Sequence, residues 1–249
     1  MRITSIDIET TGLNPSTSQV LQIGAVIFDT TDKEFTPLAT YNKVVYHREI
    51  HGEPFAIQMN SEIIKKIAIC GDEYYRAKRD YEKETSKLSA NSERANQFLC
   101  KQQELELIGR TPEDISEDFY QFLITNGGYY IIEGQQKRHF NVTGKNFWTF
   151  DNNFLKLLPN WKLFFHRRSF DPANLYYEPQ DEVLPSLQQC KERCMKMLEL
   201  ESDKELRNLF KNSEVTHDAL DDAMDVAKLV WYKTSQREAS QILKPQLQM

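Results

Sequence analysis

Two carboxylates interrupt an apolar, β-prone segment near the start of the chain. Asp7 and Glu9 lie in the run S-I-D-I-E-T-T-G. Residues two apart on a strand face the same side of a sheet, so both side chains project together. Two carboxylates in a mostly buried setting repel each other and resist desolvation unless a cation lies between them. The spacing indicates either an exposed pair without a role or a cation site. Gly12, which allows another backbone to approach closely, favours the cation site.

Two further acidic segments occur later in the chain. Asp151 ends G-K-N-F-W-T-F-D, at or near the expected start of a helix, where a plain N-cap is the simpler interpretation. The run T-H-D-A-L-D-D-A places Asp218 and Asp222 one helical turn apart, with His217 just before the first turn. Taken alone, this run is typical of a capped acidic helix.

Together the three segments resemble a known set of motifs. D-I-E-T-T-G, N-F-W-T-F-D and H-D-A-L-D-D-A, in this order, resemble the exonuclease motifs of the histidine branch of the DEDD superfamily, the DnaQ-like 3′–5′ exonucleases. The specific mark of that branch is a histidine followed five residues later by aspartate. The resemblance implies an α/β, RNase H-like fold, with a mixed five-stranded sheet flanked by helices. It assigns metal-binding carboxylates to Asp7, Glu9, Asp151 and Asp222, and a general base to His217.

The resemblance also implies a mechanism. Two Mg²⁺ or Mn²⁺ ions about 3.5–4 Å apart would stabilise the attacking and leaving oxygens of the scissile phosphate. Hard oxygen ligands favour these ions over zinc. His217 would take the proton of the attacking water, a role suited to an imidazole. The product would be a nucleoside 5′-monophosphate cut from a 3′ end.

Substrate contacts are assigned by the same resemblance. Thr10, Thr11 and Leu13 would line the pocket for the terminal nucleotide, and Met59 and Phe150 would flank it, although core packing explains these last two equally well. Asn146 is a further candidate, five positions before Asp151 where many proofreading members have four.

A pair of arginines lies in a segment that resembles part of one subgroup. R-R-S-F-D-P-A-N-L-Y, which begins with Arg167 and Arg168, is similar to the strand after the second motif in bacterial and phage members. These arginines could reach phosphates. The alternative is that one is exposed and the other paired.

Hydrophobic periodicity predicts the elements that position these residues. Strands are expected at 3–8, 20–28, 41–46, 129–132, 140–143 and 163–165. Helices are expected at 54–69, from Thr111, at 151–158, at 184–200, and from His217 or Asp218 past Val230. Strands first, then alternating helices and strands, indicate a mixed-sheet α/β fold. We expect a single exonuclease domain over residues 1–249.

Residues 72–109 differ from the rest in composition, and the resemblance does not cover them. Charged and polar residues interleave there without an internal Pro or Gly, which predicts a helical insertion, or two helices with a break near residues 89–92. Tyr74, Tyr81, Leu88 and Ala95 recur every seven residues. Such a stripe needs a partner, which would be the insertion's own second helix, a second copy of the chain in a homodimer, or a different protein.

Composition excludes several classes of protein. The 249 residues are 40% hydrophobic and 27% charged, as in ordinary globular proteins. The net charge of −6 argues against a duplex binder with a broad basic face. No apolar run approaches the roughly 18–20 residues that span a bilayer. The four cysteines lack C-x-x-C spacing, which indicates reduced thiols, and we expect a cytoplasmic protein without a membrane partner.

The substrate expected from the sequence is the 3′ end of single-stranded DNA or RNA. DNA is slightly favoured, because the motif contexts resemble phage and bacterial members. An oligoribonuclease-like 3′–5′ exoribonuclease is the alternative. A non-catalytic binding module is a third hypothesis, but such a module should lack at least one of the five motif residues, and this chain has them all.

Overall fold

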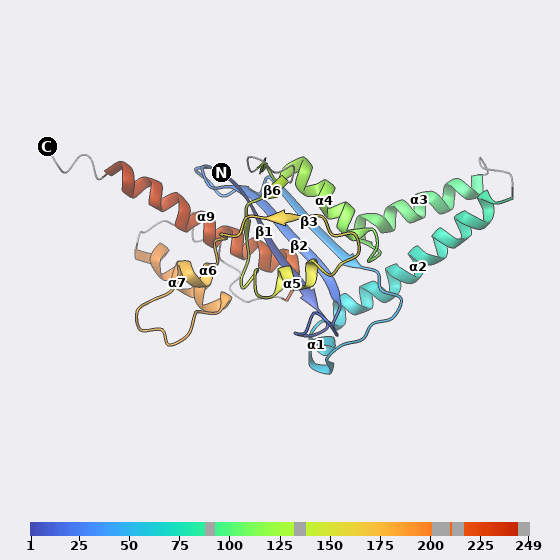
Figure 1. The fold of residues 1–249 in the computed structure, drawn as a ribbon, viewed down its shortest axis with the longest axis horizontal. Coiled ribbons are helices and arrows are strands. Elements are labelled where there is room, and N and C mark those ends of the chain that lie inside the picture. Colours follow the sequence, from blue (N-terminus) through green and yellow to red (C-terminus); the bar gives the residue numbers. More distant parts are fainter. Residues whose placement is uncertain (88–92, 132–137, 201–209, 211–216, 244–249) are drawn as a thin grey trace.

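The centre of the fold is a sheet whose first three strands come from the first 45 residues (Figure 1). The computed structural model describes residues 1–87, 93–131, 138–200, 210 and 217–243. β1 (Arg2–Thr10), β2 (Val20–Asp29) and β3 (Ala39–Val45) pair antiparallel. β7 (Val142–Thr143) joins β1 and β4 (Gly109–Arg110) joins β3, both in parallel. The strand order is β4-β3-β2-β1-β7.

The remaining elements lie around this sheet. A second sheet has the order β5-β6-β8 and contains β5 (Tyr129–Ile131), β6 (Arg138–Phe140) and β8 (Phe164–Phe165). The helices are α1 (Pro54–Met59), α2 (Ser61–Thr85), α3 (Glu93–Ile108), α4 (Ile115–Asn126), α5 (Asp151–Leu155), α6 (Pro172–Leu175), α7 (Leu187–Leu200) and α9 (Ala219–Leu243).

Helices cover both faces of the central sheet, which explains why nearly every residue of β2 is buried. On one face, Ile6 and Ile8 of β1 belong to a core cluster with Phe119 of α4 and Phe154 of α5. On the other face, Ile3 packs in a cluster with Val226 and other residues of α9. Because side chains alternate along a strand, the odd-numbered residues of β1 face α9.

The predicted α/β fold, with a mixed five-stranded sheet and flanking helices, is confirmed, with differences in which strands form the sheet. Of the segments expected as strands at 129–132 and 163–165, residues 129–131 and 164–165 lie in the second sheet. The expected strand at 140–143 divides around Asn141, whose carbonyl accepts a hydrogen bond from Thr4 N. The edge strand β4 was not predicted, because two residues carry no periodic signal.

The helix expected at 54–69 is interrupted at Asn60. α1 ends there and α2 begins at Ser61. The buried Asn60 side chain donates a hydrogen bond to the carbonyl of Thr10, at 3.0 Å. This bond joins the α1–α2 junction to the end of β1. A polar side chain with a tertiary partner therefore replaces the regular helix that the apolar spacing predicted.

α2 and α3 form a hairpin that projects away from the sheet (Figure 1). Tyr74 and Ala77 of α2 and Ala95 and Leu105 of α3 are buried. Lys101 of α3 bonds Glu73 of α2, with 3.1 Å between Nζ and Oε2. The described part of the insertion consists mainly of these two helices, and Tyr74 and Ala95 of the seven-residue repeat are buried. Leu88 and the break expected near 89–92 lie outside the described residues.

The base of this hairpin is continuous with the domain core. α2 passes through Asp72 without a break. Tyr74 and Leu105 share a core cluster with Tyr46, whose hydroxyl donates a hydrogen bond to the carbonyl of Leu105 at 2.7 Å. The part of the hairpin that stands clear of the core is thus shorter than residues 72–109.

Two further features bear on the composition. None of the four cysteines, all in described segments, forms a disulfide. Within the described segments, no helix combines the length and the apolar character needed to cross a bilayer.

Candidate active site

Asp7 and Glu9 lie on the face of β1 that α9 covers, as the alternation with Ile3 requires. In the antiparallel register, Asp7 is opposite Gly24 of β2 and Glu9 is opposite Gln22. Both carboxylates therefore project toward the beginning of α9.

The first turn of α9 rests directly on β2. A Cβ atom added at Gly24 would lie 2.1 Å from the carbonyl carbon of Ala219, so only glycine permits this approach. Gln22 is buried beside it, and its amide donates hydrogen bonds to Asp218 Oδ2 at 2.9 Å and to Asn42 Oδ1 at 2.7 Å. These contacts fix where α9 begins.

Asp218 is the N-cap of α9 and not a member of the carboxylate set. Its Oδ1 accepts hydrogen bonds from the backbone N–H groups of Leu220, at 3.0 Å, and Asp221, at 3.3 Å. These bonds satisfy amides that have no partner within the helix. One carboxylate thus both caps α9 and, through Gln22, attaches it to the sheet.

This attachment brings residues far apart in the sequence together. One potential ligand atom each from Glu9, His217 and Asp222 lies within 4.8 Å of the others. His217 is exposed and has φ = 53°, a left-handed conformation that is uncommon for a non-glycine residue. The chain thus turns sharply just before α9 and leaves the imidazole at the solvent side of the cluster.

Asp151 is the first residue of α5 and is 2% exposed. The N-cap of α5 is Phe150, so the interpretation of Asp151 as a plain N-cap is wrong. The turn before α5 is built around Asn146, with φ = 60°, whose carbonyl accepts hydrogen bonds from Thr149 N and Phe150 N. Gly144 begins this turn against Ile6, with room for no Cβ, and so holds it to β1.

Electrostatic coupling unites the four carboxylates. Burial, with Asp151, Asp222 and Glu9 nearby, raises the pKa of Asp7 well above its ordinary value. Burial and then Asp222 raise the pKa of Glu9 to about 8, against an opposing hydrogen bond from Asn60.

Asp151 shows the same effect. Burial raises its pKa to about 8, with a further contribution from Glu9, although hydrogen bonds from the backbone at Asp151 and Ile8 oppose the shift. Each of these carboxylates is therefore costly to ionise in the absence of a compensating cation.

The donor set fits a hard divalent cation. It consists of carboxylate oxygens and one imidazole, without a thiolate. Ligands that bind at about 2.0–2.6 Å from a common ion lie within about 5 Å of one another, as the atoms of Glu9, His217 and Asp222 do. Asp7 and Asp151 lie beside this cluster, because Asp222 and Glu9 contribute to the raised pKa of Asp7 and Glu9 contributes to that of Asp151.

Some predicted substrate contacts have structural partners in the turn after β1. The Thr10 hydroxyl donates a hydrogen bond to the carbonyl of Gly12 at 2.8 Å, and the Thr11 hydroxyl accepts one from Gln19 N at 2.8 Å. Both threonines are buried. Because these hydroxyls hold the turn together, a contact with a nucleotide would come from the protein backbone of the turn.

The apolar candidates differ from one another. Leu13 is 74% exposed and Met59 of α1 is 42% exposed, as side chains that meet a base would be. α1 begins beside the turn that carries Leu13, because Glu53 accepts a hydrogen bond from Leu13 N at 3.0 Å. Phe150 instead packs against the core, with its ring centroid 5.0 Å from that of Phe154.

The polar candidate Asn146 is exposed. Its backbone N–H donates a hydrogen bond to Asp171 Oδ2 at 3.0 Å, which supports a role in shaping the turn before α5.

Sequence reasoning missed Gln22, Gly24 and Asn60, which position the site without carrying its chemistry. The signal was present for the first two: an amide and a glycine interrupt an otherwise apolar strand, V-L-Q-I-G-A-V-I-F. A glycine inside a strand often marks the close approach of another backbone. Phe55, at 74% exposure on α1, is an exposed apolar side chain near Met59 that was also missed.

Gly24→Ala should displace the first turn of α9 and lower activity by about 10²-fold, the cost of misplacing catalytic groups by about 1 Å. The overpacked site should also lose about 1–3 kcal/mol of stability. Steady-state kinetics and chemical denaturation measure both effects. Gly71→Ala is the matched control, because an added Cβ there makes ordinary contacts at 3.5 Å with Tyr46. That change in α2 should stabilise the protein by about 0.5–1 kcal/mol. Equal activity in the two variants would show that α9 does not rest on Gly24 as described.

Comparisons with known proteins identify a family. A family model described as the 3′-5′ exoribonuclease Rv2179c-like domain matches residues 3–234. A search of curated protein sequences finds no significant match.

Solved structures with similar folds are distant. The nuclease domain of 3′hExo, a DEDDh family member bound to rAMP, is 14% identical, with a TM-score of 0.48 over 94% of this chain and 92% of that one. Cell-death related nuclease 4 (CRN-4) is 13% identical, with a TM-score of 0.48 over 94% and 64% of the two chains. E. coli Exonuclease I in complex with a dT13 oligonucleotide is 14% identical, with a TM-score of 0.44 over 97% of this chain and 43% of that one. The chain thus spans less than two thirds of the last two.

Proposed function

The chain belongs to the Rv2179c-like 3′–5′ exoribonuclease domain family, and from this premise we propose that it is a metal-dependent 3′–5′ exonuclease releasing nucleoside 5′-monophosphates from single-stranded nucleic acid. The observation that carries the proposal is the meeting of Glu9, His217 and Asp222 within 4.8 Å, beside the coupled carboxylates Asp7 and Asp151. A non-catalytic binding module would have no use for so costly a cluster.

Each residue of the site has a role in this proposal. Asp7, Glu9, Asp151 and Asp222 would hold two Mg²⁺ or Mn²⁺ ions. When bound, such ions stabilise the attacking and leaving oxygens of a phosphoryl displacement. His217, exposed at the solvent side of the cluster, accepts the proton of the attacking water at an imidazole nitrogen. Gln22, Gly24 and Asp218 hold α9 so that His217 and Asp222 face Glu9.

We propose single-stranded RNA as the preferred substrate, because the matching family is described as exoribonucleases. Single-stranded DNA, which the motif contexts favour, is the second candidate. Both share the phosphodiester on which the carboxylate cluster would act, so the distinction lies in contacts to the sugar.

The test is digestion of matched RNA and DNA oligomers labelled at the 5′ end, with Mg²⁺, Mn²⁺ or EDTA. Stepwise shortening from the 3′ end, faster on RNA, with 5′-monophosphates as products, is the expected result. EDTA should stop the reaction, and a 3′-phosphate or a circular strand should resist it. Internal cleavage of the circle would reject the proposal in favour of an endonuclease.

We propose that the distal part of the α2–α3 hairpin affects access to long strands and not the chemistry. Glu73 and Lys101 face each other, so Ala77 and Phe98 are near-equivalent positions one turn further out. Replacing residues 78–97 with a short Gly/Ser linker should therefore keep the hairpin base and the core cluster of Tyr46.

This shortened protein should hydrolyse a thymidine monophosphate nitrophenyl ester within about twofold of the wild-type rate, because the ester is too small to reach the hairpin. Its rate on strands of 30 nucleotides should fall relative to the rate on strands of five. Light scattering of both proteins tests the homodimer, which is one of the three arrangements that the sequence leaves open. A folded, shortened protein without ester hydrolysis would refute this assignment.

A further inference from the structure

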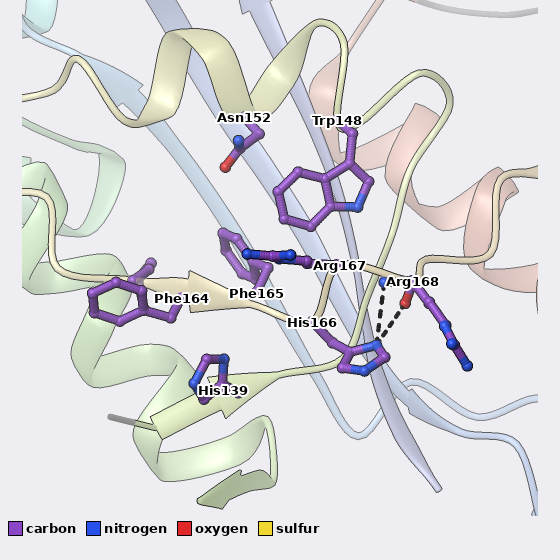
Figure 2. A pocket seen from close by; sticks show the side chains of 9 residues that line it. His139, Trp148, Asn152, Phe164, Phe165, His166, Arg167 and Arg168 are labelled. Carbon is purple, nitrogen blue, oxygen red and sulfur yellow. Dashed lines mark hydrogen bonds between the residues drawn. The ribbon is translucent and has the colours of Figure 1, made fainter. Parts of the chain in front are cut away.

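A basic pocket lies beside the carboxylate cluster, between α5 and the strands β6 and β8. Its volume is about 600 Å³ (Figure 2). Arg167, Arg168, His139 and His166 line it, and among its described lining residues none is acidic. In a chain of net charge −6, two arginines and two imidazoles in one concave place indicate a local anion site.

The two arginines have no carboxylate partner among the described residues, where neither takes part in an ion pair, and both are exposed. Two other arginines of the chain form ion pairs with carboxylates. Arg110 lies 2.8 Å from Asp118 Oδ1, and Arg193 lies 2.6 Å from Asp181 Oδ2. The guanidinium groups of the pocket are therefore available for bidentate bonds to a phosphate.

The arginines are held in place by the turn that carries them. His166 Nδ1 lies 3.2 Å from the backbone nitrogen of Arg168 and 3.0 Å from its carbonyl oxygen, as the dashed lines of Figure 2 show. This interaction closes a tight loop directly after β8. The imidazole thus supports the loop. In Figure 2 the Arg167 side chain extends across the pocket toward Phe165, whereas the Arg168 side chain extends from the other side of the loop.

Aromatic side chains complete the lining. Trp148 lies on the α5 side of the pocket and Phe164 of β8 on the other, and Phe164 is 37% exposed (Figure 2). A positively charged groove with exposed aromatic rings is the combination that binds single-stranded nucleic acid, because phosphates meet the cations and bases stack on the rings.

The position of the pocket connects it to the reaction. Asp151 and Asn152 are consecutive residues of α5, and the first belongs to the carboxylate cluster while the second lines the pocket. Trp148 belongs to the turn that delivers Asp151. α5 therefore contributes residues both to the carboxylate cluster and to the basic pocket.

We propose that this pocket binds a phosphate-linked nucleotide of the substrate strand, upstream (5′) of the scissile bond. The inference rests on the proposed function, because it is the carboxylate cluster that orients the strand. Arg167 binds the phosphate, Arg168 adds positive charge at the rim of the pocket, and Trp148 or Phe164 stacks with the base. The pocket thereby selects strands of several nucleotides over mononucleotide esters and dinucleotides.

The experiment compares Arg167→Ala/Arg168→Ala with the wild type in an Asp7→Asn background, where the strand is not consumed. Fluorescence anisotropy of a 5′-labelled RNA or DNA 10-mer should give a dissociation constant raised at least about tenfold by the double change. The slope of log K against log salt should become shallower by about one for each phosphate that the variant no longer neutralises. Arg76→Ala, at an exposed arginine of α2 outside the distal hairpin, is the matched control and should change binding by less than twofold.

A second measurement uses the same arginine changes with Asp7 intact. Hydrolysis of the nitrophenyl ester should stay within about twofold of wild type, whereas KM for the 10-mer should rise at least about tenfold. Arg167→Lys/Arg168→Lys should recover part of the binding, because the charge is kept.

Failure of this inference is distinguishable from failure of the proposed function. If wild type degrades the 10-mer and the double variant binds and degrades it equally well, the pocket is not a substrate site, although the exonuclease remains. If wild type binds the 10-mer through these arginines but shortens no strand, the pocket stands and the catalytic proposal fails. Equal reductions in rate on the ester and the 10-mer would also overturn the inference, since the pocket should not affect the ester.

Discussion

Asp7→Asn should lower kcat by at least about 10³-fold in Mg²⁺ while the metal-free protein becomes more stable. The loss follows because charge stabilisation by a bound ion is worth several kcal/mol, and about 4 kcal/mol corresponds to about 10³-fold. The gain in stability follows because the change removes one of the buried, mutually repelling carboxylates. Single-turnover kinetics and thermal unfolding in EDTA measure the two effects.

The control for this prediction is Asp80→Asn on α2, distant from the site, which should change neither quantity. Retention of more than about a tenth of the wild-type rate in Asp7→Asn would contradict the two-metal assignment. A loss of activity with a parallel loss of stability would instead show that Asp7 supports the fold.

The pH dependence of stability provides an independent readout of the same cluster. The pKa values of Glu9 and Asp151 are raised to about 8, so from about pH 5 to 8 the folded protein binds more protons than the unfolded chain. Stability without metal should therefore fall as pH rises through this range. Thermal unfolding in EDTA should show a negative slope that is smaller in Asp7→Asn. Mg²⁺ should restore most stability near pH 8, because ions that bind only the folded protein stabilise it.

His217→Ala should lower kcat by about 10²–10⁴-fold and leave Mn²⁺ affinity nearly unchanged. The first effect is the usual contribution of general base catalysis. The unchanged Mn²⁺ affinity distinguishes a general base from a metal ligand. This distinction needs a test, because a ring nitrogen of His217 lies within 4.8 Å of carboxylate oxygens of Glu9 and Asp222. Calorimetric titration with Mn²⁺ measures the affinity.

His51→Ala, another exposed histidine of the loop before α1, is the matched control and should retain full activity. A marked loss of Mn²⁺ binding in His217→Ala would assign His217 as a metal ligand and leave the general base to another group. A rate close to wild type would remove His217 from the mechanism.

Many residues of the candidate site were predictable from the sequence, because each was identified by a local rule or by a family motif. Alternation along a strand placed Asp7 and Glu9 on one face. No local rule joins Asp7 to Asp222, which are more than 200 positions apart, so their meeting depended on the resemblance. The order of the motifs carried that information, and the electrostatic coupling of the two carboxylates agrees with it.

The parts that escaped prediction depend on tertiary contacts between polar groups. Nothing in T-T-G shows that the Thr10 and Thr11 hydroxyls serve the turn, since Gln19, the partner of Thr11, is set by the packing of the loop. Likewise, apolar spacing in 54–69 gives no warning that Asn60 bonds the end of β1 and interrupts the helix. Propensity describes a segment by itself, and these residues take their conformation from a neighbour.

The dependence of the site on α9 has a consequence for synthesis of the protein on the ribosome. A nascent chain that ends before residue 217 contains Asp7, Glu9 and Asp151, but neither His217 nor Asp222. Since domains fold as the chain emerges, at about 5–20 residues per second, the sheet can assemble many seconds before α9 docks on Gly24. The growing chain therefore lacks the complete cluster until residues 217–222 have left the exit tunnel, and the proposed activity can begin only after α9 has docked on the sheet.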